Sequence, residues 1–187
     1  MSATPSAMVS LGTAATDFSL PDVISGRTLN FADVRGDRAT VVMFICNHCP
    51  FVKLLNDELV RLGHDYRERG VGLVAISPND VDRYPEDSPE RMAEVAKRLR
   101  YPFPYLYDET QEVARAYEAA CTPDFFVYDA DGRLAYRGQL DDARPGSSNV
   151  PTGRDLRRAL EDILAGKSAA AEQIPSLGCG IKWKSVV

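Results

Sequence analysis

Two continuous apolar runs, residues 40–45 and 71–76, constrain the fold of this chain more than any other feature of its sequence. Neither run alternates apolar with polar residues, which is typical of strands that are covered on both faces of a sheet. The apolar residues between the runs recur at helical spacing, and parallel strands need a crossover helix of this kind. The sequence therefore predicts a βαβ unit at the centre of the fold.

The segment that joins the two runs begins with a pair of cysteines. Cys46 and Cys49, in the pattern Cys-x-x-Cys, follow the first predicted strand directly, and Pro50 stands where the predicted helix begins. A thiol at a helix N-terminus faces unpaired backbone N–H groups and the positive end of the helix dipole, and both favour the thiolate. We therefore expect a redox site at this junction.

The rest of the pattern predicts a mixed sheet. The Asp131-Gly132 turn favours an antiparallel hairpin, and Thr152 with Asp155 resembles a capping box at the start of the last helix. The expected elements are a helix over residues 89–99, a strand over 103–107, a short helix over 112–119, strands over 125–128 and 134–136, and a helix that ends at Gly166.

Length and composition fit one domain. The chain has 187 residues, of which 44% are hydrophobic, enough for a substantial core. We expect an N-terminal arm over residues 1–8, a domain over residues 9–166, and a linker and tail over residues 167–187 that packs back on the domain. No oligomeric state is predicted.

Charge and cysteine content exclude several classes of protein. A net charge of −5 with scattered basic residues argues against nucleic acid and membrane partners. Four cysteines are too few for a disulfide scaffold, and the first 12 residues lack the pattern of a secretory signal. We therefore expect a cytoplasmic protein whose close cysteine pair is catalytic or binds a metal.

The order of elements, with Cys-x-x-Cys opening the first main helix, resembles the thioredoxin superfamily, specifically its AhpC/TSA, peroxiredoxin-like branch. The resemblance covers roughly residues 9–166. It implies an α/β, thioredoxin-like fold with a central mixed sheet flanked by helices. The stretches that carry it are 44–52 (FICNHCPFV, with the CNHCP motif), 121–126 (CTPDFF) and 178–184 (GCGIKWK).

The resemblance also implies an activity, that of a thiol–disulfide oxidoreductase in cell redox homeostasis. Cys46 would attack and Cys49 would resolve a reversible disulfide, without a cofactor. The substrates would be protein or small-molecule thiols and disulfides, with an unidentified electron donor. A cis Thr122–Pro123 bond would lie opposite the pair, with the backbone of Thr122 presented to a substrate.

Physical chemistry agrees with this assignment of the cysteines. The exposed first cysteine of such a pair can have a pKa as low as about 3.5–7.5, while the second is more shielded. An imidazolium at His48, between the two thiols, would stabilise a thiolate, so we expect His48 to tune the couple. The resemblance points the same way, because periplasmic disulfide oxidases have a histidine at the matching position.

Three further features have open roles. Cys121 is either a small buried residue or a neighbour of Cys46, and Cys179 could contact the active site or form a second disulfide. The carboxylates from Asp80 to Asp87 follow the end of a predicted strand, where α/β proteins often bind ligands, but we interpret them as a solvated acidic loop.

Departures from the family leave other functions open. Thr40 stands where thioredoxins often have a buried aspartate, so the proton acceptor for Cys49 is not identified. A thiol-dependent peroxidase is one alternative, although Cys46 stands in place of the peroxiredoxin threonine and no arginine stands at residues 121–123. A metal carrier using Cys46, Cys49 and His48 is another, and a redox-inert binding module is a third. The leading interpretation assigns no metal.

Overall fold

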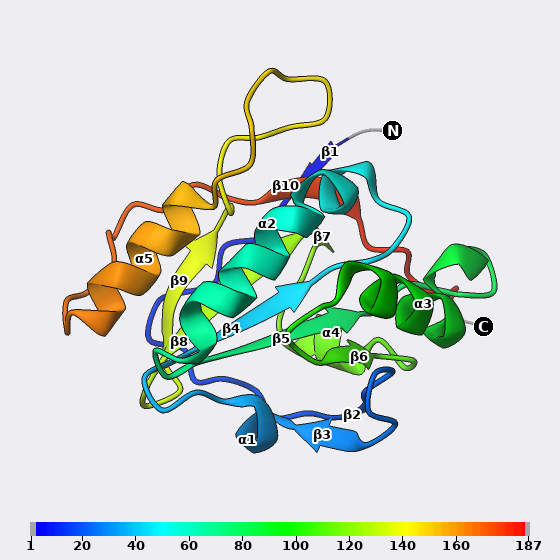
Figure 1. The fold of residues 1–187 in the computed structure, drawn as a ribbon, viewed down its shortest axis with the longest axis horizontal. Helices are drawn as coiled ribbons and strands as arrows, with labels where there is room; N and C mark the ends of the chain where they lie inside the picture. The colour runs from blue at the N-terminus through cyan, green and yellow to red at the C-terminus, as the bar shows by residue number, and fades with distance from the viewer. Residues whose placement is uncertain (1–2, 186–187) are drawn as a thin grey trace.

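The computed structural model describes residues 3–185 and has a five-stranded sheet at its centre (Figure 1). Across the sheet the strands are β6 (Tyr105–Tyr107), β5 (Val71–Ser77), β4 (Ala39–Phe44), β8 (Asp124–Asp129) and β9 (Leu134–Gly138). The pairings β4–β5 and β5–β6 are parallel, whereas β4–β8 and β8–β9 are antiparallel, so the predicted mixed sheet is confirmed.

Strand β4 lies in the middle of the sheet, and both of its faces are covered. Val41 and Met43 belong to the core cluster on one face, while Val42 and Phe44 belong to the cluster on the other. Successive side chains of a strand point to opposite faces, so a strand with two buried faces needs apolar residues throughout. This explains the lack of alternation in its sequence.

The helices cover the two faces as separate layers. Side chains of three helices join the cluster of Met43, and Figure 1 shows α2 and α5 crossing in front of the sheet. These three are α2 (Pro50–Arg67), α3 (Pro89–Leu99) and α5 (Arg154–Leu164). The opposite face is covered by α1 (Phe31–Val34), α4 (Glu112–Ala116) and the hairpin of β2 (Ser19–Pro21) and β3 (Thr28–Asn30). Sequence patterning predicted neither α1 nor this hairpin.

A second small sheet joins the two ends of the chain to the domain. Its order is β1 (Ala3–Pro5), β10 (Leu177–Gly180) and β7 (Cys121–Thr122), all antiparallel. The tail therefore contacts the domain through β10, and the predicted arm contains a strand. The boundaries expected at residues 8 and 166 stay predictions, and residues 1–2 and 186–187 lie outside the described residues.

Helix α5 begins differently from our expectation. The predicted capping box of Thr152 and Asp155 is wrong, because the N-cap residue is Gly153 and no side chain of the cap bonds the helix. Instead, the backbone N–H groups of Thr152 and Gly153 each donate to Asp141 Oδ2 at 2.7 Å. Within the first turn of α5, the N–H groups of Asp155 and Leu156 donate to the carbonyl oxygen of Leu140 at 3.1 Å and 3.3 Å.

No helix in the stretch from residue 3 to residue 185 is both long enough and apolar enough to cross a membrane.

We expect Gly178→Ala to destabilise the protein by about 1–3 kcal/mol, the usual cost of forcing extra atoms into a packed site. A Cβ at Gly178 would lie 2.1 Å from the carbonyl oxygen of Thr122, a backbone atom that cannot move without shifting β7. Urea unfolding would measure the loss. Gly180→Ala is the matched control, because its Cβ would first meet the Thr4 side chain at 3.2 Å. Equal, small losses in both variants would contradict this account of β10.

Candidate active site

The cysteine pair occupies the junction between β4 and α2. The strand ends at Phe44, the N–H of Ile45 still donates to the carbonyl of Ile76 at 3.0 Å, and Cys49 is the N-cap residue of α2. Pro50 fills the first helical position, where an N–H would have no partner within the helix. Sheet and helix therefore fix both ends of a short loop that contains the pair.

Both cysteines are buried thiols. Cys46 has 1% of its surface exposed and Cys49 has none, so the expectation of an exposed first cysteine is wrong. Cys46 is nevertheless the outer member of the pair in its contacts, because its Sγ lies 3.9 Å from Nδ1 of the partly exposed His48. Cys49 faces inward, toward the buried residues Thr122 and Cys179.

The loop before β8 lies directly against the pair. The Thr122–Pro123 peptide bond is cis, as predicted. Cys46 Sγ is 3.3 Å from Thr122 Oγ1, and Cys49 Sγ is 3.1 Å from the carbonyl oxygen of Thr122. One residue of this loop therefore contacts both sulfurs of the predicted redox pair.

Of the two isolated cysteines, Cys179 reaches the pair. Its Sγ lies 3.0 Å from Cys49 Sγ, and in the register of β10 and β7 it stands opposite Thr122. Cys121 is also buried, but its thiol donates to the carbonyl oxygen of Pro123 at 3.5 Å, and burial raises its pKa. This environment fits the interpretation of Cys121 as a small buried residue.

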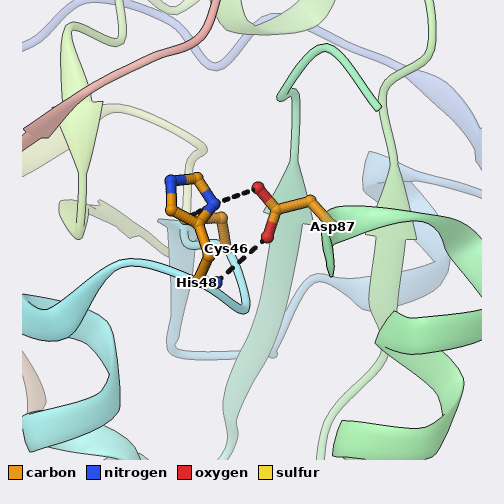
Figure 2. Close-up of side chains that lie close together, drawn as sticks. All are labelled: Cys46, His48 and Asp87. Atoms are coloured by element: carbon orange, nitrogen blue, oxygen red, sulfur yellow. Dashed lines mark hydrogen bonds and ion pairs between the residues drawn. The ribbon is translucent and has the colours of Figure 1, made fainter. Parts of the chain in front are cut away.

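The main partner of His48 is a carboxylate that the sequence did not single out. Asp87, at the end of the 3₁₀ turn η1 (Pro85–Asp87), is fully buried, so its assignment to a solvated loop is wrong. Its Oδ2 lies 2.6 Å from His48 Nδ1, and its Oδ1 accepts the backbone N–H groups of Asn47 at 2.8 Å and His48 at 3.1 Å (Figure 2). The sequence did contain one signal for Asp87: it lies in the loop that follows the end of β5, where α/β proteins often bind ligands.

The contact with Asp87 changes the charge of His48. The hydrogen bond that His48 donates to the Asp87 carboxylate raises the His48 pKa from 6.5, against the opposing effect of burial. Burial would raise the pKa of Asp87, but hydrogen bonds from His48 and Asn79 outweigh it, so that this pKa is lowered. The ring of Tyr84 stacks on the imidazole, with centroids 5.2 Å apart. An imidazolium paired with a carboxylate therefore flanks Cys46.

The pKa values of the two cysteines shift in opposite directions, and not in the expected sense. The pKa of Cys49 is lowered to about 5, chiefly by its hydrogen bond with Cys46 and then by that with Cys179, against the opposing effect of burial. The pKa of Cys46 is raised by its hydrogen bond with Cys49, by burial and by the nearby charge of Asp87. Of the two sulfurs, these shifts favour Cys49 as the site of the thiolate.

The neighbours of Cys49 also accommodate a second position of the proton. If the proton between the two sulfurs moves to Cys49, the negative charge moves to Cys46. The Cys49 thiol can then donate a hydrogen bond to the carbonyl oxygen of Thr122, which lies 3.1 Å from its sulfur. Thr122 Oγ1 and the imidazolium of His48 then face a Cys46 thiolate. The site can thus present either sulfur as a nucleophile without any other base.

Cys46, His48 and Asp87 are also the residues here that could hold a metal, since one ligand atom from each lies within 4.8 Å of the others. Their arrangement suits an ion pair better. His48 Nδ1 and Asp87 Oδ2 are 2.6 Å apart, whereas tetrahedral zinc bonds of about 2.0–2.1 Å would hold two ligand atoms roughly 3.3 Å apart. Binding a metal would therefore break their hydrogen bond.

Comparisons with known proteins show the family of the chain. Residues 11–137 match the model of the AhpC/TSA family. The chain is 26% identical over 157 residues to the thiol-disulfide oxidoreductase ResA of Geobacillus kaustophilus, covering 83% of this chain and 79% of that protein.

Solved structures show the same fold. An uncharacterized conserved protein from Geobacillus kaustophilus is 56% identical, with a TM-score of 0.97 over 100% of this chain and 99% of that one. A thiol:disulfide interchange protein of the thioredoxin family from Chlorobium tepidum is 20% identical, with a TM-score of 0.63 over 84% and 99% of the two chains. The predicted thioredoxin-like fold is confirmed.

We expect Asp87→Asn to lower the pKa of His48, because the carboxylate is the main cause of its raised value. An NMR titration of the ring resonances of His48 would measure the change. An unchanged His48 titration would contradict the assigned ion pair.

The same ion pair predicts a pH dependence of stability. Folding raises the His48 pKa above 6.5, so its contribution is fully present below that pH and is lost as the pH rises through the folded value. Folding lowers the Asp87 pKa from 3.8, so its contribution is lost as the pH falls through the folded value. Both contributions are fully present between pH 3.8 and pH 6.5. We therefore expect the difference in free energy of unfolding between the natural protein and Asp87→Asn to be largest in that range.

Proposed function

Because the chain belongs to the AhpC/TSA family of the thioredoxin superfamily, we propose that it is a thiol–disulfide oxidoreductase that uses a reversible Cys46–Cys49 disulfide. One observation carries the proposal: both sulfurs of a Cys-x-x-Cys pair contact Thr122, next to a cis-proline. The similarity to ResA supports the same class of reaction. We also propose cell redox homeostasis as its role and the cytoplasm as its location.

In the proposed reaction, Cys46 is the attacking sulfur. Its proton passes to Cys49, whose thiol then donates to the carbonyl oxygen of Thr122. The Cys46 thiolate attacks one sulfur of a substrate disulfide, forms a mixed disulfide and expels the other sulfur as a thiolate. Cys46 is suited to this step because it is the cysteine beside the partly exposed His48, whereas Cys49 faces inward.

Cys49 completes the cycle. Cys49 passes its proton to the thiolate that the substrate has released, and the Cys49 thiolate then attacks Cys46 in the mixed disulfide. The Cys46–Cys49 bond forms, the bond to the substrate breaks, and the second substrate sulfur leaves as a thiolate that takes a proton from water. The reverse sequence oxidises a substrate dithiol, and the potential of the electron donor sets the direction.

His48 and Asp87 act on Cys46 through charge. The negative charge of the Asp87 carboxylate raises the pKa of Cys46. The same carboxylate accepts the backbone N–H groups of Asn47 and His48, and those N–H groups would otherwise be free to stabilise a thiolate. The paired imidazolium of His48 offsets that charge. We therefore propose that His48 makes the Cys46 thiolate accessible at neutral pH.

We expect both Cys46→Ser and Cys49→Ser to slow the reduction of insulin by dithiothreitol by at least about a hundredfold, because the two sulfurs act as a unit. The variants should differ in what they trap. Cys49→Ser should accumulate a mixed disulfide through Cys46, detected by mass spectrometry, and Cys46→Ser should not. Cys121→Ser is the control and should retain activity. Trapping through Cys49 in Cys46→Ser would reverse the proposed roles.

A thiol-dependent peroxidase is a second candidate, favoured by the charge on Cys49. A thiolate with a pKa of about 5 can react with peroxide to form a sulfenic acid, and Cys46 and Cys179 are both placed to resolve it. Against a fast reaction, Cys46 occupies the position of the peroxiredoxin threonine, and no arginine stands at residues 121–123.

We therefore expect hydrogen peroxide to oxidise the protein only slowly compared with its exchange with disulfides. Stopped-flow tryptophan fluorescence or a coupled consumption assay would compare the two rates in the same preparation. Rapid peroxide consumption that survives in Cys46→Ser and is lost in Cys49→Ser would make the peroxidase the better assignment.

A further inference from the structure

Cys179 has no part in the reaction above, although its sulfur lies 3.0 Å from that of Cys49. We infer that Cys179 is a third redox cysteine, which takes over the disulfide from Cys46 and forms a Cys49–Cys179 bond. The inference rests on the proposed function, because the Cys46–Cys49 disulfide is its starting point. It assigns a second disulfide state to the same site.

The backbone fixes the position of Cys179. Strand β10 lies between β1 and β7, so Cys179 stands opposite Ala3 on one side and Thr122 on the other. Gly178 permits this position, because any Cβ there would come within 2.1 Å of the carbonyl oxygen of Thr122. Main-chain pairing on two sides therefore holds the thiol against the cysteine pair.

Cys49 is the central sulfur of the three. It is hydrogen-bonded to the thiols of both Cys46 and Cys179. A disulfide bond is about 2.05 Å long, so closing the present 3.0 Å contact needs a movement of about 1 Å, within the range of a side-chain rotation. Cys49 can therefore bond to either neighbour while its own backbone stays at the start of α2.

The charges around Cys179 favour transfer after Cys49 has been oxidised. Burial raises the pKa of Cys179 to about 12, and the hydrogen bond and charge of Cys49 add to this effect. Once Cys49 is in a disulfide with Cys46 it carries no charge, so both added effects disappear. Lys182, which lowers the Cys179 pKa, remains. Cys179 is thus easier to deprotonate when there is a disulfide to attack.

The transfer is balanced within the chain. The Cys179 thiolate attacks Cys49 Sγ, the Cys49–Cys179 bond forms, the Cys46–Cys49 bond breaks, and Cys46 leaves as a thiolate that takes the proton lost by Cys179. The number of disulfides is unchanged, so no external oxidant or reductant is needed. The oxidised protein then has a free thiol at Cys46, its outer position.

The pairing of β10 with Thr122 indicates what the transfer would do to the structure. The backbone of Thr122, expected from the sequence to face a substrate, is paired with the segment of this chain that contains Cys179. Strand β10 therefore occupies the position of a thiol substrate, and the Cys49–Cys179 bond would join the tail covalently to the start of α2. Both sulfurs of that bond would be buried, with 0% and 3% exposure of the two residues.

Disulfide mapping of the full-length protein in a glutathione redox buffer tests the inference. After acid quench, alkylation and digestion, mass spectrometry of the natural protein should detect both a Cys46–Cys49 and a Cys49–Cys179 linkage. Cys46→Ser should form Cys49–Cys179 as its internal disulfide, so that neither Cys49 nor Cys179 is alkylated. Cys179→Ser should lose that linkage and keep Cys46–Cys49. Cys121→Ser is the matched control and should give the pattern of the natural protein.

The outcomes separate the two proposals. Cys49 and Cys179 that both stay alkylatable in Cys46→Ser, in a buffer that fully oxidises the natural protein, would overturn the third redox cysteine and leave the proposed function intact. Failure of Cys46–Cys49 to form in Cys179→Ser would overturn the proposed function instead. If circular dichroism shows that a variant does not fold, the test is made on the natural protein alone. Absence of the Cys49–Cys179 linkage from the natural protein at every buffer potential overturns the inference.

Discussion

All six residues of strand β4 are buried, so neighbouring strands must satisfy its backbone and apolar side chains must cover both of its faces. That requirement fixes β5 on one side and β8 on the other, in parallel and antiparallel pairing respectively. It also fixes the direction in which the chain leaves the sheet. The cysteine pair follows at that point, and β5 and β8 bring Asp87 and Thr122 to the same end of the sheet.

The loop after β4 is also the place where opposing electrostatic effects meet. A helix N-terminus by itself would favour a thiolate at Cys46. In this protein, the buried carboxylate of Asp87 accepts two N–H groups of that loop and adds a negative charge beside Cys46. Cys49 lies instead beside the sulfurs of Cys46 and Cys179, and hydrogen bonds with them lower its pKa. The pKa shifts of the pair therefore depend on this environment and not on the motif alone.

The tail completes the site from the far end of the chain. Strand β10 pairs with the short strand before the cis-proline and with β1, so residues 3–5 and residues 177–180 lie side by side next to the redox pair. A disulfide between Cys49 and Cys179 would turn this non-covalent pairing into a covalent link. Exchange at the pair would then be coupled to the attachment of the tail.

The sequence by itself determined the elements whose signals are local. Unbroken apolar runs predicted β4 and β5, helical spacing predicted α2 and α3, and an Asp-Gly turn predicted the hairpin of β8 and β9. Each of these patterns depends on residues close together in the chain, where the period of the apolar residues reports the local backbone. The position of Cys46 and Cys49 at the start of α2 follows from the same local reasoning.

Only the tertiary structure decided which side chains face those cysteines. The contact of Asp87 with His48, the contact of Cys179 with Cys49 and the hydrogen bonds from the first turn of α5 to Leu140 all join residues that are far apart in the chain. No local period encodes such contacts, because they depend on how the sheet, its loops and the tail pack together. Since pKa values respond to those neighbours, the sequence identified the redox pair, and the packing decided the directions in which the two pKa values shift.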